Sequence, residues 1–293
     1  MKSIRLPAFA KINECLCVLG RRADGYHELR TIFQTIGLHD VLEMSLVRGP
    51  AIEFECDDPA LPTGRANLVW RAVVVARRAL KLRSGIHVRL EKRVPVGRGL
   101  GGGSSDAAAA LIGVERLARQ QLAPAERLRI AAALGSDVPF FLCGGRALGM
   151  GRGEELYPLA DAPKRFVVVV SPAGIAVSTR EAYGWLRAPA LTMRRSAPKL
   201  RRFCALCWSG QGASLVNDFE GAVFRRYPRL ARLKRELLRH GAAGAALAGS
   251  GSAVFGEFQS PAQARRAANL FPDDQVFITE TVTREEYLRA IGQ

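Results

Sequence analysis

The chain has 293 residues, 48% of them hydrophobic, which is enough to bury one large core or two smaller ones and excludes a mostly disordered protein. Lys and Arg number 43 against 27 Asp and Glu, and the net charge of +16 favours an anionic partner, either nucleic acid or a phosphorylated small molecule. No apolar stretch approaches the length of a membrane span, and the six scattered cysteines fit reduced thiols, so we expect a cytoplasmic protein.

The first patterned stretch, residues 7–29, reads PAFAKINECLCVLGRRADGYHEL. Its strand-like part is apolar except for charges such as Lys11, and a lysine in such surroundings usually needs a counter-charge. The following turn places Tyr26 beside His27. Such a pair suits stacking and hydrogen bonding on a planar ligand, although it more often serves structure alone.

Residues 67–91 predict a helix followed by a half-buried strand. Asn67 is a favourable first residue for the helix, apolar residues then recur at helical spacing, and Gly85 is expected to end it. The strand at 86–91, IHVRLE, alternates apolar and polar residues.

Residues 95–111, PVGRGLGGGSSDAAAAL, predict a glycine loop that leads into a helix. Five glycines within seven residues allow positive φ and a close approach of the backbone to a ligand. Ser104, Ser105 and Asp106 are N-cap types, so we expect a helix at 105–120 whose N-terminal N–H groups face an anion. A Walker A loop would need Lys and then Ser or Thr after its last glycine, and a dinucleotide-binding unit would need a strand after this helix. A phosphate is the expected ligand.

A second helix is expected at 124–134, with Pro124 in its first turn and Gly135 after its end. Asp137 then enters the apolar segment GSDVPFF (135–141). A carboxylate in apolar surroundings is costly unless it is paired or functional. Taken alone, Asp137 is better explained as a turn or helix-end aspartate.

The second half of the chain predicts another mixed unit, so we place a domain boundary near residue 160. Residues 187–212, rich in Arg, Pro and Gly, are expected to form a mobile loop, and LAGSGSAVFGEF (247–258) a second small-residue loop that leads into a strand. Two such loops would surround an anion with backbone N–H groups from two sides. The remaining predicted elements are strands at 165–172 and 275–282 and helices at 228–241, after Ser260 and after Thr283.

Three of these segments together resemble the motifs of the GHMP small-molecule kinase superfamily: AFAKIN (8–13), the glycine loop and LAGSGSAVF (247–255). RRADGYHELRTIFQTIGLHD (21–40) with GSDVPFF is similar to the branch that phosphorylates a cytidine diphosphate sugar alcohol in the non-mevalonate isoprenoid pathway. The resemblance implies an α+β protein of two domains. Residues 1–160 would form an N-terminal domain of the ribosomal S5 domain 2 type and residues 161–293 a ferredoxin-like C-terminal domain, with the active site in the cleft between them.

The resemblance also implies transfer of the γ-phosphate of ATP, with Mg²⁺, to the 2-hydroxyl of the erythritol moiety. Asp137 would be the catalytic carboxylate and Lys11 its partner, which would account for both isolated charges. Asn67 and Lys92 would lie around the adenine. Gly101→Val is expected to abolish ATP binding and to leave the chain folded. The phosphate loop would comprise Pro95, Val96, Gly97, Arg98, Gly99, Leu100, Gly101, Gly102, Gly103, Ser104 and Ser105, with Ser104 or Ser105 nearest the magnesium and Ser105 as the metal ligand.

On the acceptor side, the resemblance implies that Tyr26 and Tyr183 sandwich the cytosine. Residues 184–212 match no motif of the family, so this side of the site has fewer anchors. The residues implied to line it are Asn13, Tyr26, His27, Thr179, Tyr183, Gly249, Ser250 and Gly251.

Other functions stay open at this point. A kinase of the same superfamily for mevalonate or homoserine would have no use for a nucleobase clamp. A basic nucleic-acid-binding protein would carry interleaved aromatic residues, but these make up only 7% of the chain. Retention of both Lys11 and Asp137 argues against a ligand-sensing relative without catalysis. The expected partner is therefore a small molecule, not a membrane or a nucleic acid, and the sequence leaves both monomer and homodimer open.

Overall fold

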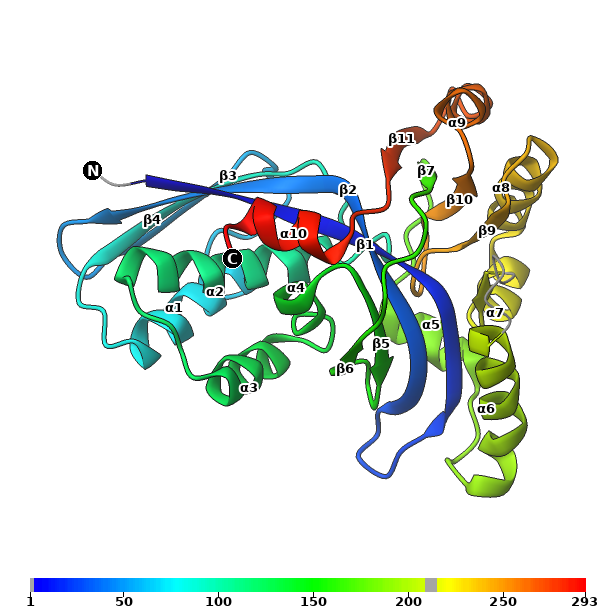
Figure 1. Cartoon of the computed structure of the whole chain (residues 1–293), viewed down its shortest axis with the longest axis horizontal. Helices are drawn as coiled ribbons and strands as arrows, with labels where there is room; N and C mark the ends of the chain where they lie inside the picture. The colour runs from blue at the N-terminus through cyan, green and yellow to red at the C-terminus, as the bar shows by residue number, and fades with distance from the viewer. Residues whose placement is uncertain (1–2, 209–214) are drawn as a thin grey trace.

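The computed structural model describes residues 3–208 and 215–293, apart from the side chains of 206–208, and shows two β-sheets with helices packed on them (Figure 1). Among these residues, no helix combines the length and the apolar character needed to cross a membrane. The first unit contains β1 (Ser3–Arg21), β2 (His27–Val47), β3 (Ile52–Cys56), α1 (Leu68–Ala79), β4 (Gly85–Glu91), α2 (Gly102–Ala118), α3 (Pro124–Leu134), α4 (Phe140–Cys143), β5 (Arg146–Met150) and β6 (Glu155–Pro158).

The first sheet is built on the long antiparallel hairpin of β1 and β2, whose register runs from the Ser3–Ser45 pair to the Arg21–His27 pair. Its strand order is β3-β4-β2-β1-β8, where β8 is Val216–Asn217, and β5 pairs with β2 and β6 with β5. The apolar face packs against α1 and against α2, whose alanine-rich sequence lets helix and sheet approach closely. This core holds the start of α2 in a fixed place.

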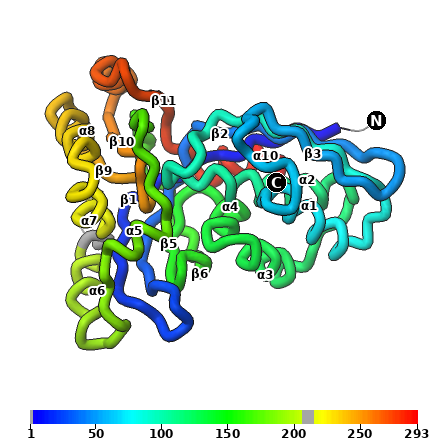
Figure 2. Tube along the Cα trace, turned by 180° about the vertical axis from the view of Figure 1, so that it is seen from behind, coloured from blue at the N-terminus to red at the C-terminus, as the bar shows by residue number. Residues whose placement is uncertain are grey.

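The second sheet has the antiparallel order β11-β7-β10-β9. Its strands are short and apolar, and α8 buries its leucine stripe against them. Figure 2, seen from behind, shows α6, α7 and α8 in a column along the outer side of this unit. The elements that follow residue 160 are β7 (Phe166–Ser171), α5 (Thr179–Leu186), α6 (Met193–Trp208), β8 (Val216–Asn217), α7 (Glu220–Arg226), α8 (Pro228–Arg239), β9 (Gly244–Leu247), β10 (Val254–Phe258), α9 (Pro261–Ala268), β11 (Gln275–Glu280) and α10 (Arg284–Ile291).

Strand β8 and helix α10, which both follow residue 160, return to the first unit. Strand β8 pairs with β1, with Val216 opposite Cys15. Helix α10 packs into the core of the first unit, where the Tyr287 hydroxyl donates a hydrogen bond to the Phe141 carbonyl oxygen (2.5 Å). The boundary near residue 160 therefore stays a prediction, because β8 of the first sheet and α10 both follow it in the chain.

The predicted helices and strands agree closely with the structure, with local corrections. Helix α2 begins at Gly102 rather than at 105, because Gly101 in the left-handed region forms its N-cap without any side-chain hydrogen bond. Helix α1 starts after Asn67, as predicted, but it ends at Ala79, and Gly85 begins β4 instead of ending the helix.

The prediction of a mobile loop at 187–212 is wrong over most of this range, because residues 193–208 form α6. Phe203 buries its ring against the cysteines of β1, and Lys199 Nζ donates to the Val18 carbonyl oxygen (2.7 Å) and to Asp218 Oδ2 (2.9 Å). Tertiary packing thus stabilises a helix that contains Pro198, a residue that argues against a helix in sequence. Residues 209–212 of the expected loop lie outside the part of the chain that is described.

Glu257 on β10 is a buried carboxyl group with a like charge nearby. Burial, and then the charge of Glu14, raise the pKa of Glu257 to about 7, against the opposing effect of Arg165 and Arg146. Its Oε1 atom makes no hydrogen bond within the described part of the chain. Because the pKa is raised on folding, the stability that the proton contributes is complete below about pH 4.5 and is lost as the pH rises through about 7.

We expect Glu257→Gln, which keeps the shape and removes the charge, to stabilise the protein only at high pH. The free energy of unfolding should be close to that of the wild type near about pH 5 and higher by about 1–3 kcal/mol near about pH 9. Urea titrations at both pH values measure this, with the exposed Glu53→Gln as the control. An equal gain at both pH values would contradict the assignment.

Candidate active site

A cavity of about 820 Å³ lies where the two units meet. The first unit contributes β1, the glycine loop, the start of α2 and the turn that follows α3. The second contributes the start of α5 and the loop at 248–252. Most of the predicted site residues, which come from distant stretches of sequence, therefore line one space.

The glycine loop leads α2 into this cavity. Gly97, Gly99 and Gly101 have φ values of 68°, 80° and 76°, which only glycine adopts readily. Gly103 is exposed in the first turn of α2, a turn that contains no acidic residue. The free N–H groups and the positive end of the helix dipole thus face the cavity and favour a phosphate there.

The structure contradicts the expectation that Gly101→Val would leave the chain folded. A Cβ atom on Gly101 would lie 2.8 Å from Cζ of Phe141 and 3.0 Å from Cγ of Lys11, at a backbone conformation that disfavours valine. Such a variant would disturb the core and Lys11 together, so it does not isolate the role of the loop.

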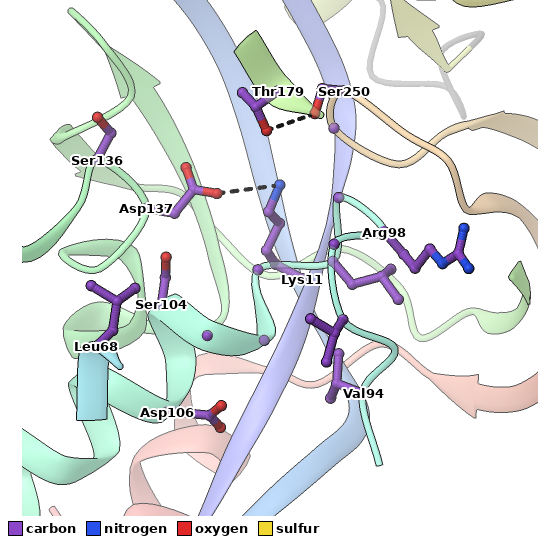
Figure 3. A pocket seen from close by; sticks show the side chains of 18 of the residues that line it. Lys11, Leu68, Val94, Arg98, Ser104, Asp106, Ser136, Asp137, Thr179 and Ser250 are labelled. Carbon is purple, nitrogen blue, oxygen red and sulfur yellow. Dashed lines mark hydrogen bonds and ion pairs between the residues drawn. The ribbon is translucent and has the colours of Figure 1, made fainter. Parts of the chain in front are cut away.

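Lys11 and Asp137 meet across the cavity, with 3.5 Å between Lys11 Nζ and Asp137 Oδ2 (Figure 3). The lysine side chain is 4% exposed, whereas that of Asp137, in the turn after α3, is 34% exposed. Lys11 Nζ also donates to Asn13 Oδ1 (2.8 Å), and Asn13 Nδ2 donates to Thr31 Oγ1 (2.8 Å). A rigid buried cation thus faces a carboxylate that a ligand can reach.

The opposite wall carries the aromatic residues and hydroxyls. Tyr183 stacks on His27, with ring centroids 4.5 Å apart and an angle of 21° between the planes, and burial raises the pKa of Tyr183 above its usual range. The hydroxyls of Thr179 and Ser250 share a hydrogen bond of 3.1 Å, and the two side chains face each other in Figure 3. Gly249 lies beside them, and Lys11 Nζ would be 3.3 Å from a Cβ at that position.

Tyr26 belongs to the same cavity but is 53% exposed. The guanidinium of Arg152 lies over its ring, with Cζ 4.7 Å from the centroid. Sequence reasoning missed Arg152, which lies in the turn between β5 and β6. In the sequence, Arg152 is marked only by the glycines on either side of it. The structure brings this turn to β2 through a hydrogen bond from Leu29 N to Gly151 O (2.7 Å), a contact that the sequence does not reveal.

Lys92 lines the cavity but already has two buried partners. Its Nζ atom contacts Asp40 Oδ2 (2.5 Å) and Asp106 Oδ2 (2.8 Å). Asp40 Oδ1 also accepts from the backbone N–H groups of Arg93 and Val94. Burial raises the pKa of Asp106 well above its usual range, although Lys92 opposes the shift. Lys92 therefore ties the start of α2 to the end of β4, a role that sequence reasoning missed.

Two other expected residues have structural partners. Asn67 caps α1, with Oδ1 accepting from Val69 N and Nδ2 donating to the Pro62 carbonyl oxygen, while it lines the cavity. Ser105 is buried within α2 and does not line the cavity, whereas Ser104 does. The metal ligand expected at Ser105 thus does not fit this geometry. The described residues also contain no group of three His, Cys, Asp or Glu side chains arranged to hold a metal.

Comparison with known families and proteins gives consistent matches. Residues 67–145 match the GHMP kinases N terminal domain, and residues 193–273 match the GHMP kinases C terminal domain. The chain is 46% identical to a 4-diphosphocytidyl-2-C-methyl-D-erythritol kinase of Solibacter usitatus, over 96% of this chain and 90% of that protein. It is 42% identical to the enzyme of the same name from Moorella thermoacetica, over 96% of this chain and 100% of that protein.

Solved structures agree with these relatives. A crystal structure of 4-(cytidine 5'-diphospho)-2C-methyl-D-erythritol kinase is 36% identical, has a TM-score of 0.78 and covers 95% of this chain and 99% of that one. A homoserine kinase from Cytophaga hutchinsonii has a TM-score of 0.74 at 20% identity, over 97% of this chain and 96% of that one. At that identity the likeness shows a shared fold alone.

Gly103→Val isolates the phosphate role of the glycine loop. Gly103 has an ordinary helical φ, and its Cβ would contact only Leu68 at 4.0 Å, so the side chain would occupy the cavity without strain. We expect ATP affinity to fall by at least about tenfold, because the valine covers the helix N-terminus.

The matched control is Gly221→Val, since Gly221 is also the second residue of a helix and has open space around it. Calorimetric titration with ATP and thermal unfolding of both variants provide the measurement. Unchanged ATP affinity in a folded Gly103→Val protein would remove the phosphate site from this loop.

Proposed function

The chain belongs to the 4-diphosphocytidyl-2-C-methyl-D-erythritol kinase family of GHMP kinases, and from that premise we propose that its cavity transfers the γ-phosphate of ATP to the 2-hydroxyl of 4-diphosphocytidyl-2-C-methyl-D-erythritol. The products are the 2-phosphate and ADP, in the non-mevalonate route to isoprenoid precursors. The observation that carries the proposal is the Lys11–Asp137 pair, which lines the same cavity as the glycine loop and the stacked Tyr183 and His27.

The donor side binds the triphosphate through the backbone. The N–H groups of the glycine loop and of the first turn of α2 donate hydrogen bonds to the phosphate oxygens, which explains why side chains are absent there. Mg²⁺ binds in proteins through one or two side chains together with substrate phosphates, and Ser104 and Asp137 are oxygen donors on the same side of the cavity (Figure 3). When bound, the ion neutralises phosphate charge. We place the reaction in the cytoplasm, where ATP is available.

The transfer step follows from the placement of Asp137. The acceptor hydroxyl donates a hydrogen bond to the Asp137 carboxylate, which receives the proton as the hydroxyl oxygen bonds to the γ-phosphorus and the bond to the ADP oxygen breaks. Lys11, held by Asn13, keeps the carboxylate oriented and places a positive charge beside the transferring group. Positioning and electrostatics supply most of the effect in this class of reaction.

The acceptor wall favours a nucleobase-bearing substrate over a small alcohol. The aromatic residues Tyr26, His27 and Tyr183 line one side of the cavity and provide faces on which a cytosine can stack. Arg180 lines the same space and supplies positive charge for a diphosphate, and Arg152, whose Nε is paired with Glu154 Oε1 (2.8 Å), lines it as well. Mevalonate and homoserine carry neither group.

An ADP-release assay with three acceptors tests this proposal: the cytidyl substrate, mevalonate and homoserine. We expect turnover with the first only. Asp137→Asn should lower kcat by about 10²- to 10⁴-fold, the range for loss of a general base, while ATP affinity stays within about threefold. Activity on another alcohol alone would support a kinase activity but contradict the assignment of the cytidyl substrate. Full activity of the Asp137→Asn variant would contradict the proposed role of Asp137.

Tyr183→Leu separates the acceptor side from the donor side. Loss of base stacking should raise KM for the cytidyl substrate by about tenfold or more, because stacking contributes about 1–3 kcal/mol per base. KM for ATP should not change, since the glycine loop is untouched. Steady-state kinetics with each substrate varied in turn provide the measurement, with the exposed Tyr157→Leu as the control. An equal rise in both KM values would point to a general disturbance instead.

A further inference from the structure

The glycine loop and the loop at 248–252 pack backbone against backbone. A Cβ atom on Gly99 would lie 1.9 Å from the carbonyl oxygen of Ala248, so only glycine fits there. The backbone N–H of Ala253 donates to the carbonyl oxygen of Arg98 (3.2 Å). The phosphate loop of the first unit therefore rests directly on a loop of the second.

The side chain of Arg98 extends this contact. Its Nη1 atom donates to Ser252 Oγ (2.6 Å), and Ser252 Oγ donates to the carbonyl oxygen of Ile175 (2.6 Å). A hydroxyl has one proton, and because Ser252 gives it to Ile175, its oxygen is left to accept from Arg98. Ser252 is fully buried, so neither of its hydrogen bonds is exchanged readily for water.

These hydrogen bonds join the donor and acceptor sides of the cavity. Ile175 precedes α5 by four residues, and α5 begins with Thr179. Thr179 in turn shares a hydrogen bond with Ser250, two residues before Ser252. One arginine on the phosphate loop is thus linked to both segments that carry acceptor-side hydroxyls.

Arg98 does not point toward the reacting centre. Figure 3 shows its side chain leaving the glycine loop on the side away from the Lys11–Asp137 pair. Its guanidinium is engaged with Ser252, although the residue lies within the loop predicted to bind ATP. A cation in a phosphate loop is expected to bind phosphate, so this orientation calls for another role.

We propose that Arg98 is a positioning residue, which fixes the phosphate loop to Ser252 and thereby sets the distance between the γ-phosphate and the acceptor hydroxyl. The role rests on the proposed kinase reaction. Phosphoryl transfer needs the reacting atoms at about 3–3.5 Å, and a misplacement of about 1 Å can cost about 100-fold in rate. Loss of Arg98 therefore lowers kcat and leaves nucleotide affinity unchanged.

A double-mutant cycle of Arg98→Ala and Ser252→Ala tests the proposal, with kcat measured by ADP release and Kd for ADP measured by calorimetry. We expect each single variant to lose about tenfold in kcat and the double variant to lose no more than the worse single one. Kd for ADP should stay within about threefold throughout. Arg93→Ala is the matched control, because Arg93 is an exposed arginine that contacts Glu91 and does not line the cavity.

Several results would overturn the positioning role. An ADP affinity at least about tenfold weaker in Arg98→Ala alone would make Arg98 a phosphate ligand. Losses in kcat that add in the double variant would mean that Arg98 and Ser252 act independently, and an unchanged kcat would remove any role.

If Ser252→Ala does not fold, Arg98→Lys replaces it, because lysine keeps the charge on a shorter side chain. The positioning role predicts a reduced kcat and unchanged ADP affinity in both Arg98 variants, whereas a phosphate ligand predicts that lysine restores affinity. Wild-type turnover with the three acceptors tests the proposed function separately. The double-mutant cycle then uses whichever acceptor the wild type phosphorylates. A wrong substrate assignment therefore shows in the wild type, whereas a wrong role for Arg98 shows only in the variants.

Discussion

The buried ammonium of Lys11 is the constraint on which the site depends. An isolated charge in a protein interior costs several kcal/mol, so the surroundings must supply partners for it. Asn13 supplies one, Asp137 supplies a second, and the ring of Phe33 lies 5.5 Å from Nζ. Because these partners come from β1, from β2 and from the turn after α3, satisfying one charge fixes three segments relative to one another. The geometry needed for phosphate transfer is thus the same geometry that makes the buried lysine tolerable.

A second buried charge supports the donor side in the same manner. Lys92 lies between Asp40 and Asp106, and Asp40 also accepts from two backbone N–H groups of the segment that leads to the glycine loop. The group carries two carboxylates for one ammonium, and burial, the largest effect, raises the pKa of Asp106 against the opposing charge of Lys92. The helix N-terminus can then present its N–H groups to a triphosphate without a charged carboxylate in its first turn.

Sequence alone predicted what is local and periodic. Helix α3 was predicted with its observed bounds, because Pro124 and Gly135 mark its ends in the residues themselves. Helix α2 starts earlier than predicted, since its cap is the left-handed backbone of Gly101, which no side-chain pattern reveals. Helix α6 was missed, because its support comes from Phe203 packing on β1, a contact between residues far apart in the chain. The pairing of Lys11 with the turn after α3 was likewise reached only through the family resemblance, since neither position explains its charge alone.

Because the fold is shared with kinases of other alcohols, substrate specificity must come from the side of the cavity that is proposed to bind the acceptor. A homoserine kinase matches nearly the whole chain in three dimensions at 20% identity, so the two-unit architecture does not choose the alcohol. The roles proposed for the glycine loop and the Lys11–Asp137 pair, to hold a triphosphate and to receive a proton, would serve any kinase of this fold. What remains to discriminate is the surface built by Tyr26 and the stacked His27 and Tyr183. These residues come from the hairpin of β1 and β2 and from α5. Under the proposed function, the hairpin of the first unit and a helix of the second would therefore recognise the substrate together.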